Sequence, residues 1–142
     1  IAPGNACTSN CGTNVNIAVN DFDAIKNLVW EKAINLVLVG PEDPLVNDIH
    51  DYFLNDEVLK DIPVIGPKKD GAQLEGSKDF SKQFMLKHGV PTARYATFTK
   101  DNLNDGFLFL ESLQPPFVLK SDSLASGKFL LIINDINEAK EE

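Results

Sequence analysis

The strongest constraint on the fold is a pair of short apolar runs, each with a glycine at or next to its end. The first reads NLVLVG over residues 35–40 and the second reads IPVIGP over residues 62–67. Unbroken apolar runs of this length are typical of strands buried on both faces of a parallel sheet. Between them, apolar side chains recur at three- and four-residue spacing from Leu45 to Phe53, which is a helical pattern. The order strand, helix, strand predicts a parallel sheet.

Local signals add elements before and after this pair. Residues 15–17 are expected to form a short strand, and Asp21 has the position of a helix N-cap. Asp43 followed by Pro44 predicts the start of the next helix, because Asp accepts hydrogen bonds from free N–H groups there and Pro suits the first turn. The segment 68–76 has charge and two glycines but little apolar periodicity, so we expect it to be a connection.

The second half of the chain begins with a different rhythm. Ser77 is the expected N-cap of a helix that ends near Gly89. We then expect, in order, the following elements: a strand over 93–98, a helix from about Asp101, strands over 115–120 and 128–133, and the start of a helix over 135–142.

Composition excludes several classes of partner. The net charge is −8, with 13 basic and 21 acidic residues, which argues against non-specific binding to nucleic acid or to an anionic membrane. No apolar run reaches membrane-spanning length, and the first residues lack the pattern of a signal peptide. The 43% hydrophobic content is enough for a packed core. We therefore expect a cytoplasmic protein, and a local basic pocket for a small phosphorylated ligand stays possible.

The two cysteines, Cys7 and Cys11, lie four residues apart in a polar segment. A zinc site would need two further ligands, and the only histidines, His50 and His88, are distant in sequence. Two reduced thiols are the favoured interpretation, with zinc as the alternative.

Three turns are expected where a parallel sheet binds ligands, beyond the carboxyl ends of its strands, and the second and third of them follow the two apolar runs. They are APGN (2–5), VGPEDPL (39–45) and IGP (65–67). In the second, Gly40 lets a ligand approach the backbone and Glu42 can accept hydrogen bonds from hydroxyl or amino groups. Ordinary turn chemistry explains the same residues, so both interpretations stay open on the pattern alone.

The stretch KSDSLASGKFLLI over residues 120–132 places two lysines around small residues. It is not a Walker loop, because Gly127 and Lys128 are followed by Phe129, and Ser123 stands near the place of the first glycine. A flap whose backbone N–H groups and lysines hold phosphates is one interpretation. A hairpin with solvent-exposed lysines is the other.

Taken together, four motifs resemble the glycinamide ribonucleotide synthetase family, also called phosphoribosylamine–glycine ligases, which are ATP-grasp enzymes of purine synthesis. The motifs are IAPGNACT (1–8), VGPEDPLV (39–46), IGPKKDGAQLEGSKDFSKQFMLKHGVPTARY (65–95) and FVLKSDSLASGKFLLI (117–132). The resemblance implies an α/β fold. Residues 1–76 are then an incomplete, Rossmann-like pre-ATP-grasp domain that binds substrate and lacks its first strand. Residues 77–142 are then the truncated start of an ATP-grasp domain.

The resemblance also implies a reaction. The family phosphorylates the glycine carboxylate with ATP and Mg²⁺, and the amine of 5-phosphoribosylamine then attacks the acyl phosphate. Such chemistry depends on holding charge in place, so no residue is assigned as catalytic. Carried over by position, the phosphoribosylamine pocket would include Gly4, Asn5, Gly40, Pro41 and Glu42. The ATP phosphates would be held by Lys78, Lys120, Ser126, Gly127 and Lys128. The Mg²⁺ ligands and adenine contacts are expected after Glu142, so no metal ligand is assigned.

Departures from the family pattern leave a second hypothesis open. Cys7, Ser123 and Phe129 stand where the family has glycines. The alternative is therefore a non-catalytic nucleotide- or phosphate-binding module, or a decayed pseudoenzyme. In either case we expect the isolated chain to be inactive. We also expect the strand over 35–40 to have an open apolar edge that invites self-association.

Overall fold

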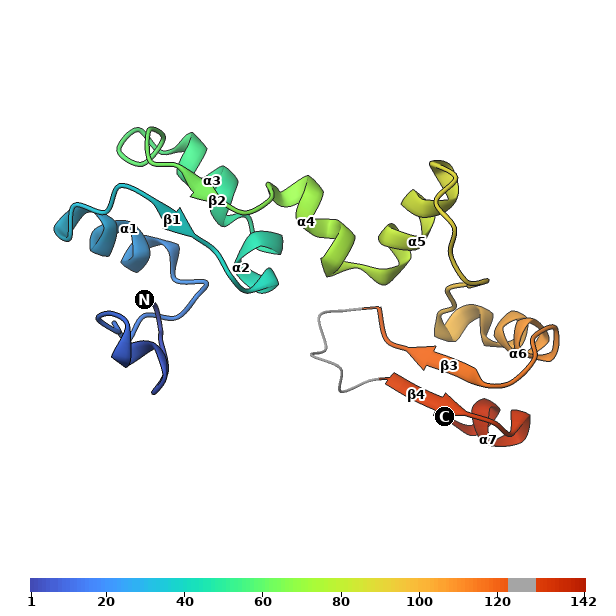
Figure 1. Ribbon diagram of the computed structural model, residues 1–142. Coiled ribbons are helices and arrows are strands. Elements are labelled where there is room, and N and C mark those ends of the chain that lie inside the picture. Colours follow the sequence, from blue (N-terminus) through green and yellow to red (C-terminus); the bar gives the residue numbers. More distant parts are fainter. Residues whose placement is uncertain (123–129) are drawn as a thin grey trace. The chain divides into compact units, whose positions relative to one another are not determined.

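The computed structural model describes residues 1–122 and 130–142, which form two compact units, Ile1–Gly76 and Ser77–Glu142. Both units combine helices with a two-stranded sheet, so the predicted α/β class is confirmed (Figure 1). The sheet of the first unit is parallel and the sheet of the second is antiparallel.

The first unit has two strands, which lie before and after a helical segment in the sequence. Strand β1 (Val37–Leu38) pairs with β2 (Val64–Ile65) in parallel, with Val37 opposite Val64, and this confirms the predicted pairing. Its helices are η1 (Thr8–Asn10), α1 (Phe22–Glu31), α2 (Glu42–Val46), α3 (Ile49–Asn55) and α4 (Lys69–Gly76). The buried core consists of Val29, Leu45, Ile49, Phe53, Leu59 and Ala72.

Helix α1 begins as the sequence predicts. The Asp21 side chain accepts a hydrogen bond from the Ala24 N–H at 3.1 Å and so caps the helix. Val29 is buried in the core, and Phe22 and Ile25 pack against it from the same helix.

The single helix predicted after Asp43 is wrong, because the segment forms two helices. Helix α2 starts at Glu42 with Pro41 as its N-cap, and Asp43 lies in its first turn. Pro44 is tolerated there because the N–H groups of a first turn have no partner within the helix. Asp48 then has φ = +85°, a left-handed conformation that separates α2 from α3.

The connection predicted over 68–76 is also wrong, because this segment forms α4. Its start is capped from elsewhere in the fold: the Asp51 carboxylate of α3 accepts the Lys69 N–H at 2.9 Å. This hydrogen bond is the largest of the causes that lower the pKa of Asp51. Gly76 allows close packing, since a Cβ at this position would lie 2.8 Å from Cγ2 of Val46. Gly76, one of the two glycines that suggested a break, therefore serves helix packing instead.

Burial of the strands on both faces is contradicted. The side chain of Leu38 is 72% exposed and that of Ile65 is 52% exposed. In the described residues the sheet has only these two strands, and helices cover one of its faces. The regular strands are correspondingly short.

The strand predicted over 15–17 is absent from the first unit. The Val15 N–H donates to the Ile1 carbonyl at 2.9 Å, but the Ile17 N–H turns back to the Val15 carbonyl at 2.8 Å. A three-residue turn of this kind takes the backbone away from a strand ladder.

The second unit is built around a hairpin. Strand β3 (Phe117–Lys120) pairs with β4 (Leu130–Ile133) in antiparallel register, with Phe117 opposite Ile133. Its helices are α5 (Lys78–Lys87), η2 (Lys100–Asn102), α6 (Leu103–Glu111) and α7 (Ile136–Glu141). Its buried core consists of Phe117, Ile133 and Ala139.

The cap of α5 is confirmed, since the Ser77 hydroxyl accepts the Phe80 N–H at 3.1 Å. The strand predicted over 93–98 is wrong. Side chains rather than a strand partner hold this segment: Thr97 donates to the Asp79 carboxylate at 2.5 Å, and Arg94 donates to the Ser112 carbonyl at 3.2 Å.

Candidate functional site

The loop that carries Gly4 and Asn5 is held by hydrogen bonds to its own residues. Gly4 has φ = +78°, and a Cβ there would lie 2.3 Å from Cγ of Asn14. The Asn14 side-chain NH₂ donates to the Asn5 carbonyl at 2.7 Å, and the Asn5 N–H donates to the Thr8 hydroxyl at 2.7 Å. Only glycine fits at position 4 in this conformation.

Within this loop the Asn5 side chain has one end engaged. Its Oδ1 accepts the N–H groups of Cys7 at 2.9 Å and Thr8 at 3.0 Å. Among the described residues its NH₂ group has no hydrogen-bond acceptor, and the residue is exposed. The NH₂ group is therefore available to donate to an oxygen atom of a ligand.

Gly40, Pro41 and Glu42 come one residue after the end of β1 and lie at the carboxyl end of the parallel sheet, as predicted. All three are exposed. Apart from Gly40 itself and its two neighbours in the chain, no heavy atom of the described residues lies within 4 Å of the position that a Cβ of Gly40 would occupy. A ligand thus has room to reach this backbone, and the Glu42 carboxylate in the first turn of α2 is accessible.

The two predicted parts of the phosphoribosylamine pocket belong to the same unit. Within the described chain, however, no hydrogen bond or ion pair joins Gly4 or Asn5 to residues 40–42. Their union into one pocket stays a prediction.

Sequence reasoning missed the part played by His50 at the end of the sheet. Its Nδ1 lies 2.7 Å from the carbonyl oxygen of Gly66, which follows β2. Because a carbonyl can only accept, Nδ1 carries the hydrogen in this contact. The bond ties α3 to the turn after β2. A lone histidine in a helical pattern gives no sequence signal for such a role.

In the second unit, one carboxylate joins the neighbourhoods of Lys78 and Lys120. Asp122, two residues after Lys120, accepts the Asp79 N–H at 3.1 Å, and the Ser77 hydroxyl lies 3.1 Å from its Oδ2. Ser77 and Asp79 are the residues on either side of Lys78. Both lysines are exposed. Two predicted phosphate-binding residues therefore lie on backbone segments that are held together.

The other predicted ATP contacts, Ser126, Gly127 and Lys128, lie outside the described residues, as do Ser123 and Phe129.

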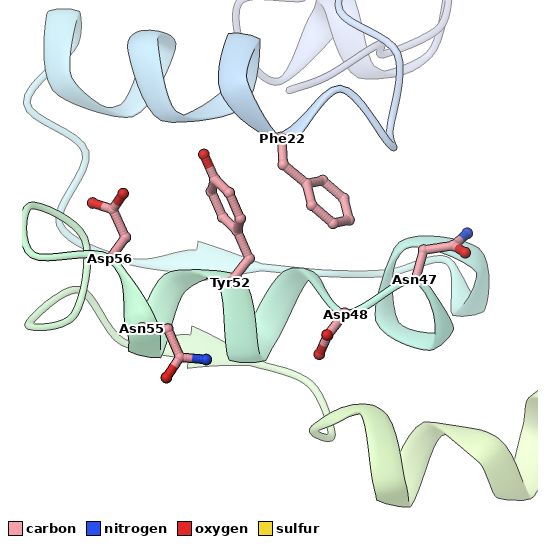
Figure 2. A pocket seen from close by; sticks show the side chains of 6 residues that line it. All are labelled: Phe22, Asn47, Asp48, Tyr52, Asn55 and Asp56. Atoms are coloured by element: carbon pink, nitrogen blue, oxygen red, sulfur yellow. The ribbon is translucent and has the colours of Figure 1, made fainter.

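A surface depression of about 410 Å³ lies between α1 and α3, and it contains none of the predicted site residues (Figure 2). It is lined by Phe22, Asn47, Asp48, Tyr52, Asn55 and Asp56. Tyr52 extends from α3 toward α1 and donates to the Asp23 carboxylate at 2.8 Å. Burial, followed by this hydrogen bond, raises the pKa of Tyr52 to about 12.

The carboxylates of the depression are already engaged. Asp56 pairs with Lys26, and the hydrogen bond from Lys26 is the main cause that lowers the pKa of Asp56. Asp48 lies 3.5 Å from the ammonium group of Lys69. These pairs explain the depression as part of the packing between helices.

None of the helices in the described residues has the length and apolar composition needed to cross a membrane. In the same ranges, 1–122 and 130–142, no three His, Cys, Asp or Glu side chains cluster in a way that could bind a metal ion. Cys7 and Cys11 are both exposed free thiols.

Comparison with known families accounts for the whole chain in two adjacent parts. Residues 1–75 match the model of the phosphoribosylglycinamide synthetase N domain. Residues 76–142 match the model of the ATP-grasp (A) domain of the same synthetase. The chain belongs to the phosphoribosylglycinamide synthetase family. The resemblance of the four motifs to this family is therefore confirmed.

Individual members of the phosphoribosylglycinamide synthetase family agree. The phosphoribosylamine–glycine ligase of Vibrio cholerae is 39% identical over 143 residues, which cover 99% of this chain and 32% of the relative. The enzyme of the same name from Lactococcus lactis is 41% identical and covers 99% of this chain. The crystal structure of the Thermotoga maritima phosphoribosylamine–glycine ligase matches with a TM-score of 0.65 and 34% identity, over 98% of this chain and 30% of that one. The chain spans about a third of the length of its relatives.

Proposed function

We propose that this chain is the part of an ATP-dependent ligase that binds 5-phosphoribosylamine and begins the ATP site, in an enzyme that joins glycine to that amine in purine synthesis. The observation that carries the proposal is the match of two adjacent family models over residues 1–75 and 76–142. The relatives that cover 99% of the chain bear the name of this ligase. The proposal includes a cytoplasmic location and three small-molecule partners, namely glycine, 5-phosphoribosylamine and ATP.

The roles of the two units follow from their residues. Residues 1–76 are the substrate-binding domain, where the Asn5 NH₂ group and the Glu42 carboxylate contact the hydroxyl, phosphate or amino groups of phosphoribosylamine. Gly4 sets the loop conformation, while Gly40 and Pro41 leave room for the ligand at the end of β1.

Residues 77–142 begin the ATP-grasp domain. Lys78 and Lys120 neutralise the phosphate oxygens of ATP, and their exposure and shared support by Asp122 fit this role. Ser126, Gly127 and Lys128 complete the phosphate contacts in the proposal. When bound, ATP supplies the phosphoryl group that activates the glycine carboxylate.

Mg²⁺ has no fitting ligand set among residues 1–122 and 130–142, where no cluster of three carboxylate, thiol or imidazole groups occurs. We therefore assign it no residue and no step on this chain.

A chimera tests the proposal directly. This chain replaces the aligned 143 residues of the Vibrio cholerae relative, and the product is assayed with ATP, Mg²⁺, glycine and freshly generated phosphoribosylamine. We expect turnover by the chimera and none above background by the 142-residue chain alone. Product formation by the isolated chain, or an inert but folded chimera, contradicts the proposal.

Single substitutions in the chimera test the assigned pocket. Glu42→Gln should raise the KM for phosphoribosylamine and leave the KM for ATP unchanged. Glu31→Gln, at the exposed end of α1, removes the same charge from the same unit and serves as the control. Equal KM values for the two variants would remove Glu42 from the pocket.

The second candidate is a decayed, non-catalytic phosphate-binding module. The observation that favours it is the presence of Ser123 and Phe129 at positions where the family has glycines. If these residues impose a backbone strain of about 1–3 kcal/mol, nucleotide binding is weakened about 5- to 150-fold. In the chimera, Ser123→Gly with Phe129→Gly should then tighten ATP binding measured by calorimetry, and Lys120→Ala should abolish the gain. Unchanged affinity would remove the case for decay.

A further inference from the structure

The side chain of Asp122 forms hydrogen bonds with the start of helix α5, which is distant from it in sequence. Its Oδ1 accepts the Asp79 N–H at 3.1 Å, and the Ser77 hydroxyl lies 3.2 Å from Oδ1 and 3.1 Å from Oδ2. These partners are 43 and 45 residues away in sequence. We propose that Asp122 is a positioning residue for the ATP site. Its carboxylate holds the backbone around Lys78 next to the end of β3 that carries Lys120.

The contact does more than cap a helix. Ser77 alone already caps α5, because its hydroxyl oxygen accepts the Phe80 N–H at 3.1 Å. The same hydroxyl donates its hydrogen to Asp122, while the Asp79 N–H donates to Asp122 directly. The carboxylate thus completes the hydrogen bonds of the first turn, where the helix dipole favours a negative charge.

Lys78 lies between Ser77 and Asp79, the two residues bonded to Asp122, so these hydrogen bonds also restrain the backbone of Lys78. Lys78 cannot move its backbone away from β3 unless the bonds of Ser77 and Asp79 to Asp122 break. On the other side, Lys120 is fixed by its pairing with Leu130 in the hairpin. One carboxylate therefore sets the separation of the two backbone segments that carry the predicted phosphate-binding lysines.

Charge supports the same conclusion. Two ammonium groups that bind one phosphate chain repel each other before the ligand arrives. The negative charge of Asp122, close to both backbone segments, offsets this repulsion. The role for ATP rests on the proposed function, whereas the role in holding the backbone does not.

The first experiment measures the backbone in the 142-residue chain without nucleotide. Asp122→Ala should speed hydrogen exchange of the Asp79 amide by about threefold to thirtyfold, the effect of losing a helix-cap hydrogen bond. Asp105→Ala removes a first-turn carboxylate from α6 of the same unit and should leave that amide unchanged. Equal exchange rates in the two variants overturn the inference.

The second experiment measures ATP in the chimera described above. Asp122→Ala should raise the KM for ATP about threefold to thirtyfold and leave the KM for glycine unchanged. Asp122→Asn should have an intermediate effect, because its amide oxygen still accepts the Asp79 N–H while the charge is lost. If the Ala variant does not fold, the Asn variant and its exchange rates carry the test.

The outcomes separate the two proposals. A parent chimera without turnover refutes the proposed function and the ATP role of Asp122 with it, while the exchange rates still decide whether the carboxylate holds the backbone. An active parent whose KM for ATP is unchanged in Asp122→Ala overturns the inference alone. Equal rises in the KM for ATP and for glycine indicate a general loss of structure and also overturn it.

Discussion

Replacing Gly4 by Ala should disorder the loop that carries Asn5, because the structure leaves no place for a methyl group. Gly4 has φ = +78°, and the added Cβ would lie 2.3 Å from both Cγ and Oδ1 of Asn14. Such a distance forces the Asn14 side chain to move. Its NH₂ group then loses the 2.7 Å hydrogen bond to the Asn5 carbonyl.

The magnitude follows from three contributions. A left-handed conformation costs an L-residue about 1–2 kcal/mol. The lost hydrogen bond adds about 0.5–1.5 kcal/mol. Alanine also restricts the unfolded chain, which offsets about 0.4–1 kcal/mol. The loop should therefore be destabilised by about 0.5–3 kcal/mol, which corresponds to an exchange rate about 2- to 150-fold faster for the amides that depend on it.

Hydrogen exchange at the Cys7 and Thr8 amides measures this effect, since both donate to the Asn5 side chain. Gly12→Ala is the matched control, because a Cβ there would have only an ordinary contact, 3.4 Å from Ile1. In the chimera, Gly4→Ala should also raise the KM for phosphoribosylamine and leave the KM for ATP unchanged.

A double variant separates strain from collision. Gly4→Ala with Asn14→Ala removes the collision and keeps the positive φ, so its exchange rates should fall between those of the parent and Gly4→Ala, once the loss of Asn14 alone is subtracted. If Gly4→Ala exchanges no faster than Gly12→Ala, the reasoning from φ and contact distance is refuted.

Three further predictions concern stability and association. Gly76→Ala should lower the free energy of unfolding of the first unit, measured in urea, by about 1–3 kcal/mol, because its Cβ would lie 2.8 Å from Val46. Gly71→Ala in the same helix should stay within about 1 kcal/mol of the parent, and equal effects of the two substitutions would contradict the prediction. A lysine hydrogen bond holds the pKa of Asp56 below its ordinary 3.8, so the stability it supplies is complete above about pH 4 and is lost as the pH falls through the lower folded value. Asp56→Asn should flatten that acid limb in urea titrations, and an unchanged limb would count against the ion pair. Leu38→Thr should reduce self-association of the 142-residue chain in light scattering, because this side chain is 72% exposed on the sheet; a monomeric parent would remove the premise.

Helix starts with a local cap could be predicted from the sequence. Asp21 and Ser77 each bond an N–H group three residues ahead, so both the signal and its physical cause lie within one turn. The parallel pairing of β1 and β2 was predictable for a related reason, since an intervening helix enforces a crossover.

Helix α4 could not be predicted in this way, because what stabilises it is distant in sequence. Its first N–H is capped by Asp51, 18 residues earlier, and Gly76 packs on Val46 of another helix. A reader of the local sequence sees two glycines and charge, and both favour a loop. The break at Asp48 was hidden for the opposite reason, since the apolar spacing continues across it while the backbone does not.

In the candidate site, too, local sequence predicted some residues but not the contacts that connect them. Family motifs predicted Lys78 and Lys120 as residues of one site, but their structural link through Asp122 depends on hydrogen bonds across 43 to 45 residues. The contact of His50 with the Gly66 carbonyl was equally invisible, because it joins a helix to a turn. Motifs identify residues by type and order, whereas the side chains that position them appear only once the chain has folded.

The placement of the single tryptophan decides which spectroscopic signal can report on ligands. Trp30 lies in α1 of the first unit and is 73% exposed, while the described residues proposed to bind ATP belong to the second unit. Each unit has its own buried core. Melting curves followed by intrinsic tryptophan emission should therefore record the first unit and miss stabilisation of the second by nucleotide. Calorimetry, or a tryptophan introduced near the hairpin, is needed before a flat emission curve is taken as evidence that ATP does not bind.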